Sequence, residues 1–437
     1  MTASTIVAPA SGPGPAGVSI IRLSGPACEA VAQRLIGVTP EPRRAKLAKV
    51  VDLTGDPIDT ALVLYFPKPN SFTGEDVLEL HVHGGRAVVR DTIAACLGMA
   101  DVRLAEAGEF SRRAYLNGKM DLTAAEGLAD LVEAETAAQR RQALRQMQGE
   151  LADEVGRWRE VLIDCLADAE GDIDFPDEDL PPGLSDRARH RILDLQARLE
   201  GYLAESRRAE RVRSGFQVAI VGKPNAGKSS LINQLARRDA AIVSPVPGTT
   251  RDIVDVRLIL GGMVILISDT AGLRDSEDLI EAEGVRRARQ RAKEADLRLA
   301  LLTSQEDRSE FADLMGDGDL WLLGQADRVE WANVDNGDLA VSSVTRQGLD
   351  ELEALLTQRA QADLGKSESA PLTRLRHQEA VREGIAALDR ALTASVQAPE
   401  LVAEDLRLAA RALGRVTGRV DMDDVLDRLF SQFCIGK

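Results

Sequence analysis

The stretch that decides the fold of this chain runs from Gly222 to Ser230 and reads GKPNAGKSS. It fits G-x-x-x-x-G-K-[ST], a pattern that wraps nucleotide phosphates when a strand precedes it and a helix follows. Residues 216–221 form an apolar run of strand length, and residues 230–235 have the pattern of a helix start. Main-chain N–H groups and a helix N-terminus then favour phosphate. A chance glycine loop does not explain this context, so we expect the chain to bind a nucleoside triphosphate.

Later motifs indicate GTP. In the phosphate loop, Lys228 is expected to reach the β- and γ-phosphates, and the Ser229 hydroxyl to bind Mg²⁺. Thr250 offers a second hydroxyl for Mg²⁺, and Asp269 closes an apolar run as a Walker-B aspartate that would reach Mg²⁺ through water. The Gly272 amide is placed to sense the γ-phosphate. A phosphate loop, a threonine and D-x-x-G in this order predict a GTPase.

The guanine-reading motif N-K-x-D is incomplete. After the apolar run 320–323 the chain reads Gly324, Gln325, Ala326, Asp327. Asp327 can accept hydrogen bonds from the ring N–H and the exocyclic amine of guanine, but the asparagine and lysine that brace the loop and cover the base are missing. Residues 341–344 (VSSV) stand where a base-contacting S-A-K loop usually lies. We therefore expect GTP to bind with weaker guanine discrimination than an intact motif gives.

Hydrolysis needs an oriented water and neutralisation of developing charge. The residue after D-x-x-G is Leu273, which cannot orient water, so the acidic stretch 275–281 supplies the candidates. Asn225 lies inside the phosphate loop, where a carboxamide oxygen can coordinate a monovalent cation beside the phosphates. Such a cation can replace an arginine finger. The alternative, an asparagine that only shapes the loop, stays open.

Composition bounds the class of protein. The chain has 437 residues and is 44% hydrophobic, which predicts two to four domains with ample cores. Its net charge of −16 argues against a general polyanion binder. Without leader pattern or long apolar run, it is expected to be cytoplasmic, with no membrane segment. The cysteines have no C-x-x-C spacing and fit a reducing cytosol without zinc or disulfides: Cys28, Cys96, Cys165 and Cys434.

Periodicity separates the chain into regions. Residues 1–118 hold short β-rich runs between Gly/Pro turns and are expected to form an α+β domain. Residues 119–212 have helical periodicity, 213–365 alternate strand and helix as an α/β P-loop domain does, and 366–437 are helical again. The flanking helices indicate a nucleotide domain inserted into an all-α domain, although two separate helical domains would give the same pattern.

Some stretches within these regions carry less decodable information. Residues 172–182 are expected to interrupt the helices as a loop, and the Arg-rich stretch 207–213 to form a solvated helix face. His81 and His83 share a strand face, but few histidines and no third ligand favour a plain strand over a metal site. The tail 433–437 has the composition of a frayed end, with a reactive thiol as the alternative.

Six further motifs occur along the chain: NSFTGED at 70–76, GEFS at 108–111, IDFP at 173–176, GTTRD at 248–252, DTAGLR at 269–274 and FCIGK at 433–437. Together they resemble the MnmE (TrmE) family of tRNA modification GTPases. They occur in the family's order, and the likeness runs through the whole chain.

The resemblance implies a fold and an activity. The family has an N-terminal tetrahydrofolate-binding domain that mediates homodimerisation, then a helical domain with an inserted G domain. With an FAD-dependent partner, MnmG (GidA), in a heterotetramer or larger complex, it adds a 5-carboxymethylaminomethyl or aminomethyl group to the wobble uridine of certain tRNAs. A tetrahydrofolate derivative, in the 5-formyl or 5,10-methylene form, is the implied one-carbon donor.

The resemblance also implies roles for single residues. K⁺ would be bound by Asn225, Thr249 and the carbonyls of Ser244 and Val246, and Mg²⁺ by Ser229 and Thr250. Glu281 would orient the attacking water, and Lys228 would share in catalysis. Folate positions match Arg22, Glu79, Lys119 and Lys437, and the tail brings Cys434 near that pocket. The nucleotide contacts implied are Asn225, Ala226, Gly227, Lys228, Ser229, Ser230, Ser244, Thr249, Thr250, Asp269, Thr270, Ala271, Gly272, Asp327, Ser342 and Ser343.

The chain departs from the family's pattern at two places. Gly324 and Gln325 replace the Asn-Lys pair, and residues 12–17 differ from the usual glycine/arginine pattern before the first core strand. Two rival functions stay open: a GTPase switch in ribosome assembly, and a folate-dependent one-carbon transferase whose G domain is only regulatory.

Overall fold

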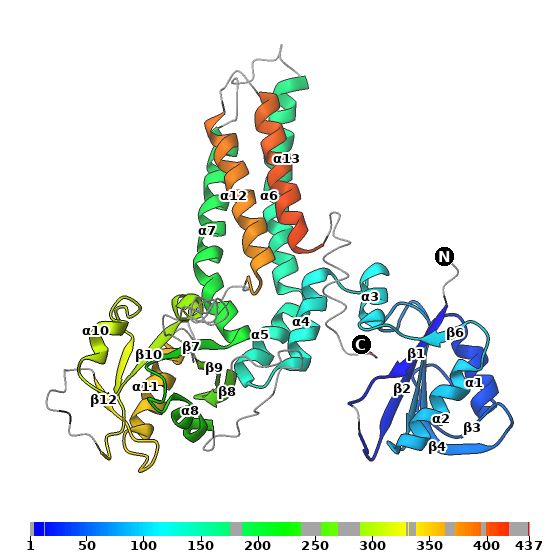
Figure 1. Ribbon diagram of the computed structural model, residues 1–437. Coiled ribbons are helices and arrows are strands. Elements are labelled where there is room, and N and C mark those ends of the chain that lie inside the picture. The colour runs from blue at the N-terminus through cyan, green and yellow to red at the C-terminus, as the bar shows by residue number, and fades with distance from the viewer. Residues whose placement is uncertain are drawn as a thin grey trace, which may run out of the picture. The chain divides into compact units, whose positions relative to one another are not determined.

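A computed structural model describes most of the chain. The described residues are 4–12, 14–174, 186–236, 255–269, 289–328, 331, 338–362, 372–394, 399–418 and 436. The helices and strands are labelled in Figure 1. The chain divides into two compact units. The first unit comprises Met1–Ala129, Gln146–Ile192 and Ala386–Lys437, and the second comprises Asp130–Arg145 and Leu193–Ile385.

The first unit contains a six-stranded sheet in the order β3-β4-β5-β2-β1-β6. Neighbouring strands are antiparallel, except that β1 and β6 are parallel. Helices α1 (Cys28–Ile36) and α2 (Arg86–Leu97) pack on one face of this sheet through a buried core that includes Leu23 and Leu80. The α+β prediction is confirmed. The strands are β1 Thr5–Pro9, β2 Ser19–Ser24, β3 Lys46–Val51, β4 Pro57–Phe66, β5 Val77–Val82 and β6 Val102–Leu104.

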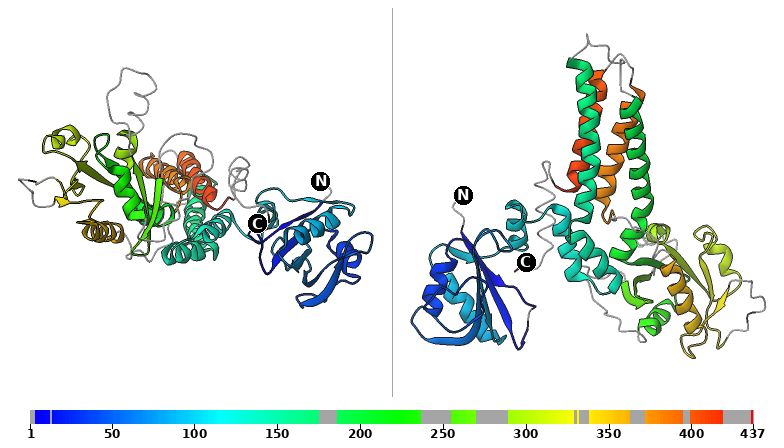
Figure 2. Two further views of the ribbon diagram at one scale, coloured as in Figure 1. Left: turned by 60° about the horizontal axis from the view of Figure 1, so that its bottom comes forward. Right: turned by 180° about the vertical axis from the view of Figure 1, so that it is seen from behind.

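Among the described residues, the first unit also includes the helices α3 Glu109–Leu116, α4 Leu122–Glu133 (its last turn falls in the second unit), α6 Glu150–Asp174 and α13 Pro399–Val416. Helices α6 and α13 lie side by side (Figure 2). The loop predicted from residue 172 is wrong at its start, because α6 continues to Asp174. The residue before a proline is disfavoured in a helix, so the first strong breaker is the step to Pro176. The remainder of that loop lies outside the described residues.

The second unit contains a six-stranded sheet in the order β12-β11-β10-β7-β9-β8. Neighbours are parallel, except for the β8–β9 hairpin. Helices α8 (Lys228–Ala236) and α11 (Leu349–Gln361) share a core with one face, and α10 (Asp307–Phe311) with the other. This is the predicted α/β P-loop fold. The strands are β7 Phe216–Val221, β8 Asp255–Leu260, β9 Met263–Asp269, β10 Leu297–Leu302, β11 Leu320–Leu323 and β12 Leu339–Ala340.

The remaining helices are α5 Ala137–Met147, α7 Asp186–Ser214 and α12 Leu375–Thr393. The Arg-rich end of α7 is not the solvated face that the sequence predicts. Arg211 lies 2.7 Å from Asp296, and the Arg213 guanidinium donates to the Thr373 carbonyl at 3.0 Å. Both contacts bind this end of α7 to its own unit. Within the described part of the chain, no helix combines the length and the apolar character that a membrane crossing requires.

Candidate functional site

The phosphate loop connects β7 to α8 at the carboxyl edge of the second sheet. Asn225 has a left-handed backbone with φ of 62°, and its exposed carboxamide makes no hydrogen bond to another described residue. The Lys228 ammonium donates to the carbonyls of Gly222 at 2.8 Å and Lys223 at 3.0 Å. The loop is therefore already wound around the lysine that we expect to meet the β- and γ-phosphates.

The end of β9 lies beside this loop. Its last residue, Asp269, is the register partner of Ile220 on β7, so the main chain of the Walker-B position adjoins the start of the phosphate loop. Ser229 and Ser230 lie exposed in the first turn of α8. The fold thus brings together two segments to which the sequence assigns Mg²⁺. The side chain of Asp269 lies outside the described part.

A cavity of about 160 Å³ opens beside the phosphate loop. Its walls come from that loop, from α8, and from the ends of β10, β11 and β12. A base bound in this cavity would adjoin the phosphates, as a single nucleotide requires. The lining residues are Ala226, Gly227, Leu231, Leu301, Gly324, Gln325, Asp327, Arg328, Val341, Ser343 and Val344.

Ser342 holds Asp327 at this cavity. The buried Ser342 hydroxyl donates to Asp327 Oδ1 at 2.5 Å, and its oxygen accepts the N–H groups of Val344 and Thr345 at 3.2 and 3.1 Å. The hydrogen bond from Ser342 holds the pKa of Asp327 below its usual range. Asp327 is therefore a charged and oriented acceptor, the state needed for charge-assisted bonds to guanine.

Gly324 stands where the family's asparagine is missing, and the fold leaves little room for a side chain there. A Cβ on Gly324 would lie 2.9 Å from the Leu302 carbonyl oxygen. The Gly324 N–H donates to that carbonyl at 2.8 Å, and the Gly324 carbonyl accepts the Trp331 indole N–H at 3.2 Å. The base loop is thus braced by main-chain and indole contacts. Sequence reasoning missed the contact from Trp331 because no motif marks it.

The first sheet places Arg22 of β2 opposite Glu79 of β5. Arg22 Nε lies 2.9 Å from Glu79 Oε1, and His81 Nε2 lies 3.1 Å from Glu79 Oε2. The guanidinium also lies over the rings of Phe72 and Phe110, at 5.7 and 5.9 Å from their centroids. Two residues that the resemblance assigns to folate therefore form one polar group beside aromatic rings. The contact from His81 was not foreseen.

Gly436 of the tail is buried against the end of β1. Its φ is 103°, and an added Cβ would collide with the Pro9 carbonyl. Strand register pairs Pro9 with Ile21, the residue before Arg22. Gly436 thus lies against a strand that neighbours the Arg22 strand, and its close approach there explains why the position is a glycine.

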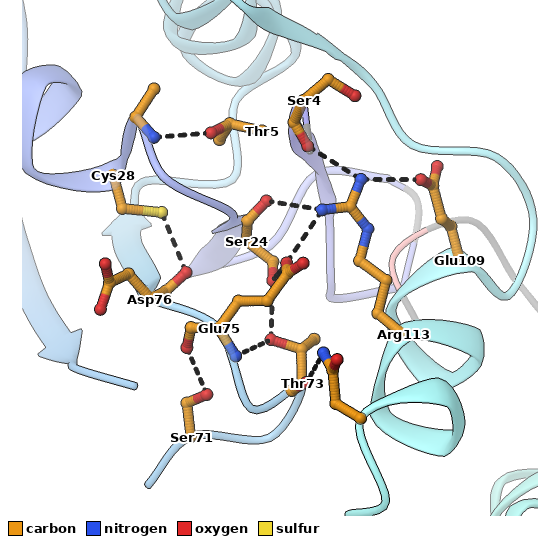
Figure 3. Close-up of polar contacts among 12 residues, drawn as sticks. Ser4, Thr5, Ser24, Cys28, Ser71, Thr73, Glu75, Asp76, Glu109 and Arg113 are labelled. Atoms are coloured by element: carbon orange, nitrogen blue, oxygen red, sulfur yellow. Dashed lines mark hydrogen bonds and ion pairs between the residues drawn. The ribbon is translucent and has the colours of Figure 1, made fainter. Parts of the chain in front are cut away.

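Arg113 of α3 joins the motif at 70–76 to the motif at 108–111 (Figure 3). Its guanidinium donates to Glu75 and to Glu109, each at 2.9 Å. The Arg113 side chain is only 12% exposed. In the sequence these two motifs are only family signatures. In the structure they contribute residues to one mostly buried ion-pair cluster.

Hydroxyl groups complete this cluster (Figure 3). The Ser24 hydroxyl donates to Glu75 at 2.7 Å and lies 2.7 Å from the Thr73 hydroxyl oxygen. The Asn117 side chain donates to the Thr73 carbonyl at 2.7 Å. The stretch 71–76 is thus a structural joint between β2 and α3.

Glu109 carries much of the charge in this joint. Burial alone would raise the pKa of Glu109, but hydrogen bonds from Arg103, the Glu106 N–H and Arg113 outweigh it and lower that pKa. Glu109 therefore stays ionised between two guanidinium groups, and its negative charge favours the folded state at neutral pH.

The whole chain matches known proteins. Residues 5–119 match the family model described as GTP-binding protein TrmE N-terminus, and residues 122–434 match MnmE helical domain. The tRNA modification GTPase MnmE of Rhodospirillum rubrum is 52% identical over 457 residues, which cover 100% of both chains. The chain belongs to the MnmE family. The MnmE of Maricaulis maris is 50% identical over 99% of this chain and 100% of its own length.

Membership of the MnmE family makes this chain a tRNA modification GTPase. Solved structures add less. The G domain of the T. maritima FeoB iron transporter covers 33% of this chain at 24% identity with a TM-score of 0.28. Aquifex aeolicus Era covers 39% at 24% identity with a TM-score of 0.27. Scores this low carry no argument about function.

Several residues expected from MnmE motifs lie outside the described part of the chain. Lys119 is described: it is exposed, and its aliphatic carbons lie near Gly74. Over the described residues alone, no group of three or more His, Cys, Asp and Glu side chains could hold a metal ion. The residues outside are Ser244, Val246, Thr249, Thr250, Thr270, Ala271, Gly272, Glu281, Cys434 and Lys437.

Proposed function

We propose that this chain is a potassium-activated GTPase that modifies the wobble uridine of certain tRNAs with an FAD-dependent partner, MnmG (GidA). The product is a 5-carboxymethylaminomethyl or aminomethyl group. The observation that carries the proposal is the end-to-end match to a tRNA modification GTPase at 52% identity. That match spans both the phosphate loop and the N-terminal region, so it favours an activity that needs both.

The phosphate loop supports the cation half of the proposal. An exposed Asn225 carboxamide without a described partner is free to bind K⁺ beside the phosphates. Thr249 and the carbonyls of Ser244 and Val246 would complete that set, and Ser229 and Thr250 would bind Mg²⁺. The cations supply charge neutralisation during phosphoryl transfer. Lys228 binds phosphate oxygens, Asp327 orients the base with Ser342 and Ser343, and Glu281 orients water.

The N-terminal region supports the proposed use of a folate as one-carbon donor. A tetrahydrofolate carries an aromatic ring system and carboxylates, and the group formed by Arg22 and Glu79 offers a cation and an acceptor beside two rings. Lys119 and Lys437 would add contacts to the folate, and the tail would bring the Cys434 thiol near it. The folate, in its 5-formyl or 5,10-methylene form, supplies the one-carbon unit. We further propose that this domain forms the homodimer and that the protein is cytoplasmic.

We keep the predicted division into domains as part of the proposal. Residues 1–118 bind folate, 119–212 and 366–437 form the helical domain, and 213–365 form the inserted G domain.

Mass spectrometry of wobble uridines tests the proposed function. Cells that lack the chain should lose the 5-carboxymethylaminomethyl and aminomethyl nucleosides, and the wild-type chain should restore them. Normal wobble uridines in such cells, together with copurification of the chain with ribosomal subunits, would favour a role in ribosome assembly instead.

A further inference from the structure

Lys223, the second residue of the phosphate loop, forms an ion pair that no motif predicts. Its ammonium lies 2.6 Å from Asp307 Oδ1 and 3.5 Å from Glu310 Oε2. Asp307 opens α10, just after β10, and its side chain is only 1% exposed. The pair therefore ties the phosphate loop to the turn that follows the neighbouring strand.

The Asp307 end of this pair is rigid. Its carboxylate accepts the N–H and hydroxyl of Thr303 at 2.7 and 2.8 Å, and the N–H and hydroxyl of Ser304, each at 3.0 Å. Burial would raise the pKa of Asp307, but the bonds from Lys223, Thr303 and Ser304 outweigh it and hold that pKa far below its usual range. The carboxylate is thus charged and fixed in position near neutral pH.

The Lys223 end of the pair leads to the phosphate-binding lysine. The Lys223 carbonyl accepts a hydrogen bond from Lys228 Nζ at 3.0 Å, beside the bond from Lys228 to Gly222. Gly222 packs against the Leu301 carbonyl of β10 so closely that a Cβ would lie 2.6 Å from its oxygen. The main chain that holds Lys228 is therefore fixed both by the packing of Gly222 on β10 and by the ion pair of Lys223.

We propose that Lys223 and Asp307 are positioning residues for GTP hydrolysis, acting through the Lys223 main chain on Lys228. Phosphate-loop N–H groups bind the ground state and the transition state alike, whereas the Lys228 charge matters most as charge develops on the γ-phosphate. Loosening the ion pair should therefore lower kcat more than it raises KM.

The test uses the full chain with Lys223→Met, which removes the ammonium but keeps most of the stem. Because misplaced catalytic charges are costly, kcat for GTP should fall about tenfold while KM changes less than about threefold. Lys223→Arg keeps a cation that reaches Asp307, and it should stay within about twofold of wild type. Arg289→Met is the matched control, since it removes the partner of Asp313 from an exposed ion pair in the same unit.

A double variant separates positioning from a general structural role. In an Asp307→Asn background, Lys223→Met should lower kcat little further, because the two residues act through one contact. If Asp307→Asn does not fold, the single Lys223 variants decide. A kcat within twofold of wild type for Lys223→Met overturns the proposal, as does an equal loss of kcat in Lys223→Arg.

Discussion

The phosphate loop of the second unit and the loop at 70–76 of the first unit both gather polar groups, but they hold them differently. Two main-chain carbonyls of the phosphate loop accept bonds from Lys228, and its Lys223 side chain pairs with Asp307. Asn225 and Ser229 are exposed at the rim of the loop. In the loop at 70–76, side chains bond to side chains through the mostly buried Arg113.

This difference separates a ligand site from a structural joint. Exposed polar groups at the mouth of a preformed loop leave room for phosphate and cations, whereas buried polar groups that satisfy one another leave none. Changes in the phosphate loop should therefore alter catalysis with little effect on stability. Changes around Arg113 should do the reverse.

The largest expected effect is the response to potassium. GTP hydrolysis should be faster in KCl than in NaCl of equal ionic strength by roughly 10³-fold or more, the range of an arginine finger. Asn225→Ala should lose this response but still bind nucleotide. Asn233→Ala, at an exposed position on α8, should keep it. Equal rates of GTP hydrolysis in the two salts would exclude activation by a bound K⁺.

The next largest effect concerns the stability of the ion-pair cluster around Arg113. Arg113→Met should destabilise the N-terminal region by about 3 kcal/mol, because it leaves Glu75 and Glu109 mostly buried without their shared cation. Hydrogen exchange of peptides covering β1 and β2 measures this, and GTP turnover should change little. Arg90→Met, which breaks an exposed pair, should leave the stability of this region almost unchanged. Equal losses of stability in the two variants would contradict the structural role of the Arg113 cluster.

Glu281→Ala should slow GTP turnover by about 10²-fold with little change in GTP affinity, because only the attacking water loses its orienting group. Single-turnover hydrolysis and titration with a GTP analogue measure the two quantities. Asp278→Ala is the control from the same acidic stretch and should stay near wild type. The opposite pattern would assign the role to Asp278.

The smallest effect concerns the base loop. Gln325→Lys restores one family residue at a position whose φ of 53° is already left-handed, and it should tighten GTP binding by about 1 kcal/mol. Gly324→Asn should add nothing, because its Cβ meets the Leu302 carbonyl; Gly324→Ala measures that steric cost alone. Titration with a GTP analogue decides. A gain from Gly324→Asn over Gly324→Ala would show that the loop can open.

The phosphate loop could be predicted because all its parts follow one another in the sequence at fixed spacing. Strand, glycines, Lys228 and helix are consecutive, so β7 and α8 are where the sequence places them. Asp327 was found in the same way, as the last residue of a degraded motif. The α+β character of the first region followed from its short alternating strands.

The long-range ion pairs could not be predicted because their partners are distant in the sequence. Arg113 pairs with Glu75, and Lys223 pairs with Asp307. No local sequence pattern predicts either ion pair. The Arg-rich end of α7 was misread for the same reason, since the partner of Arg211 lies 85 residues away. Long-range ion pairs depend on the fold, whereas a phosphate loop depends mainly on its own residues.

The central claim is that the GTPase site serves tRNA modification. Cells lacking the chain are complemented with the wild type or with Glu281→Ala at equal expression, and the wobble uridines are quantified by mass spectrometry. Glu281→Ala should leave the 5-carboxymethylaminomethyl and aminomethyl nucleosides near the level of the uncomplemented cells. Full modification by a variant that hydrolyses GTP about 10²-fold more slowly would contradict the claim and leave the G domain a regulatory role only.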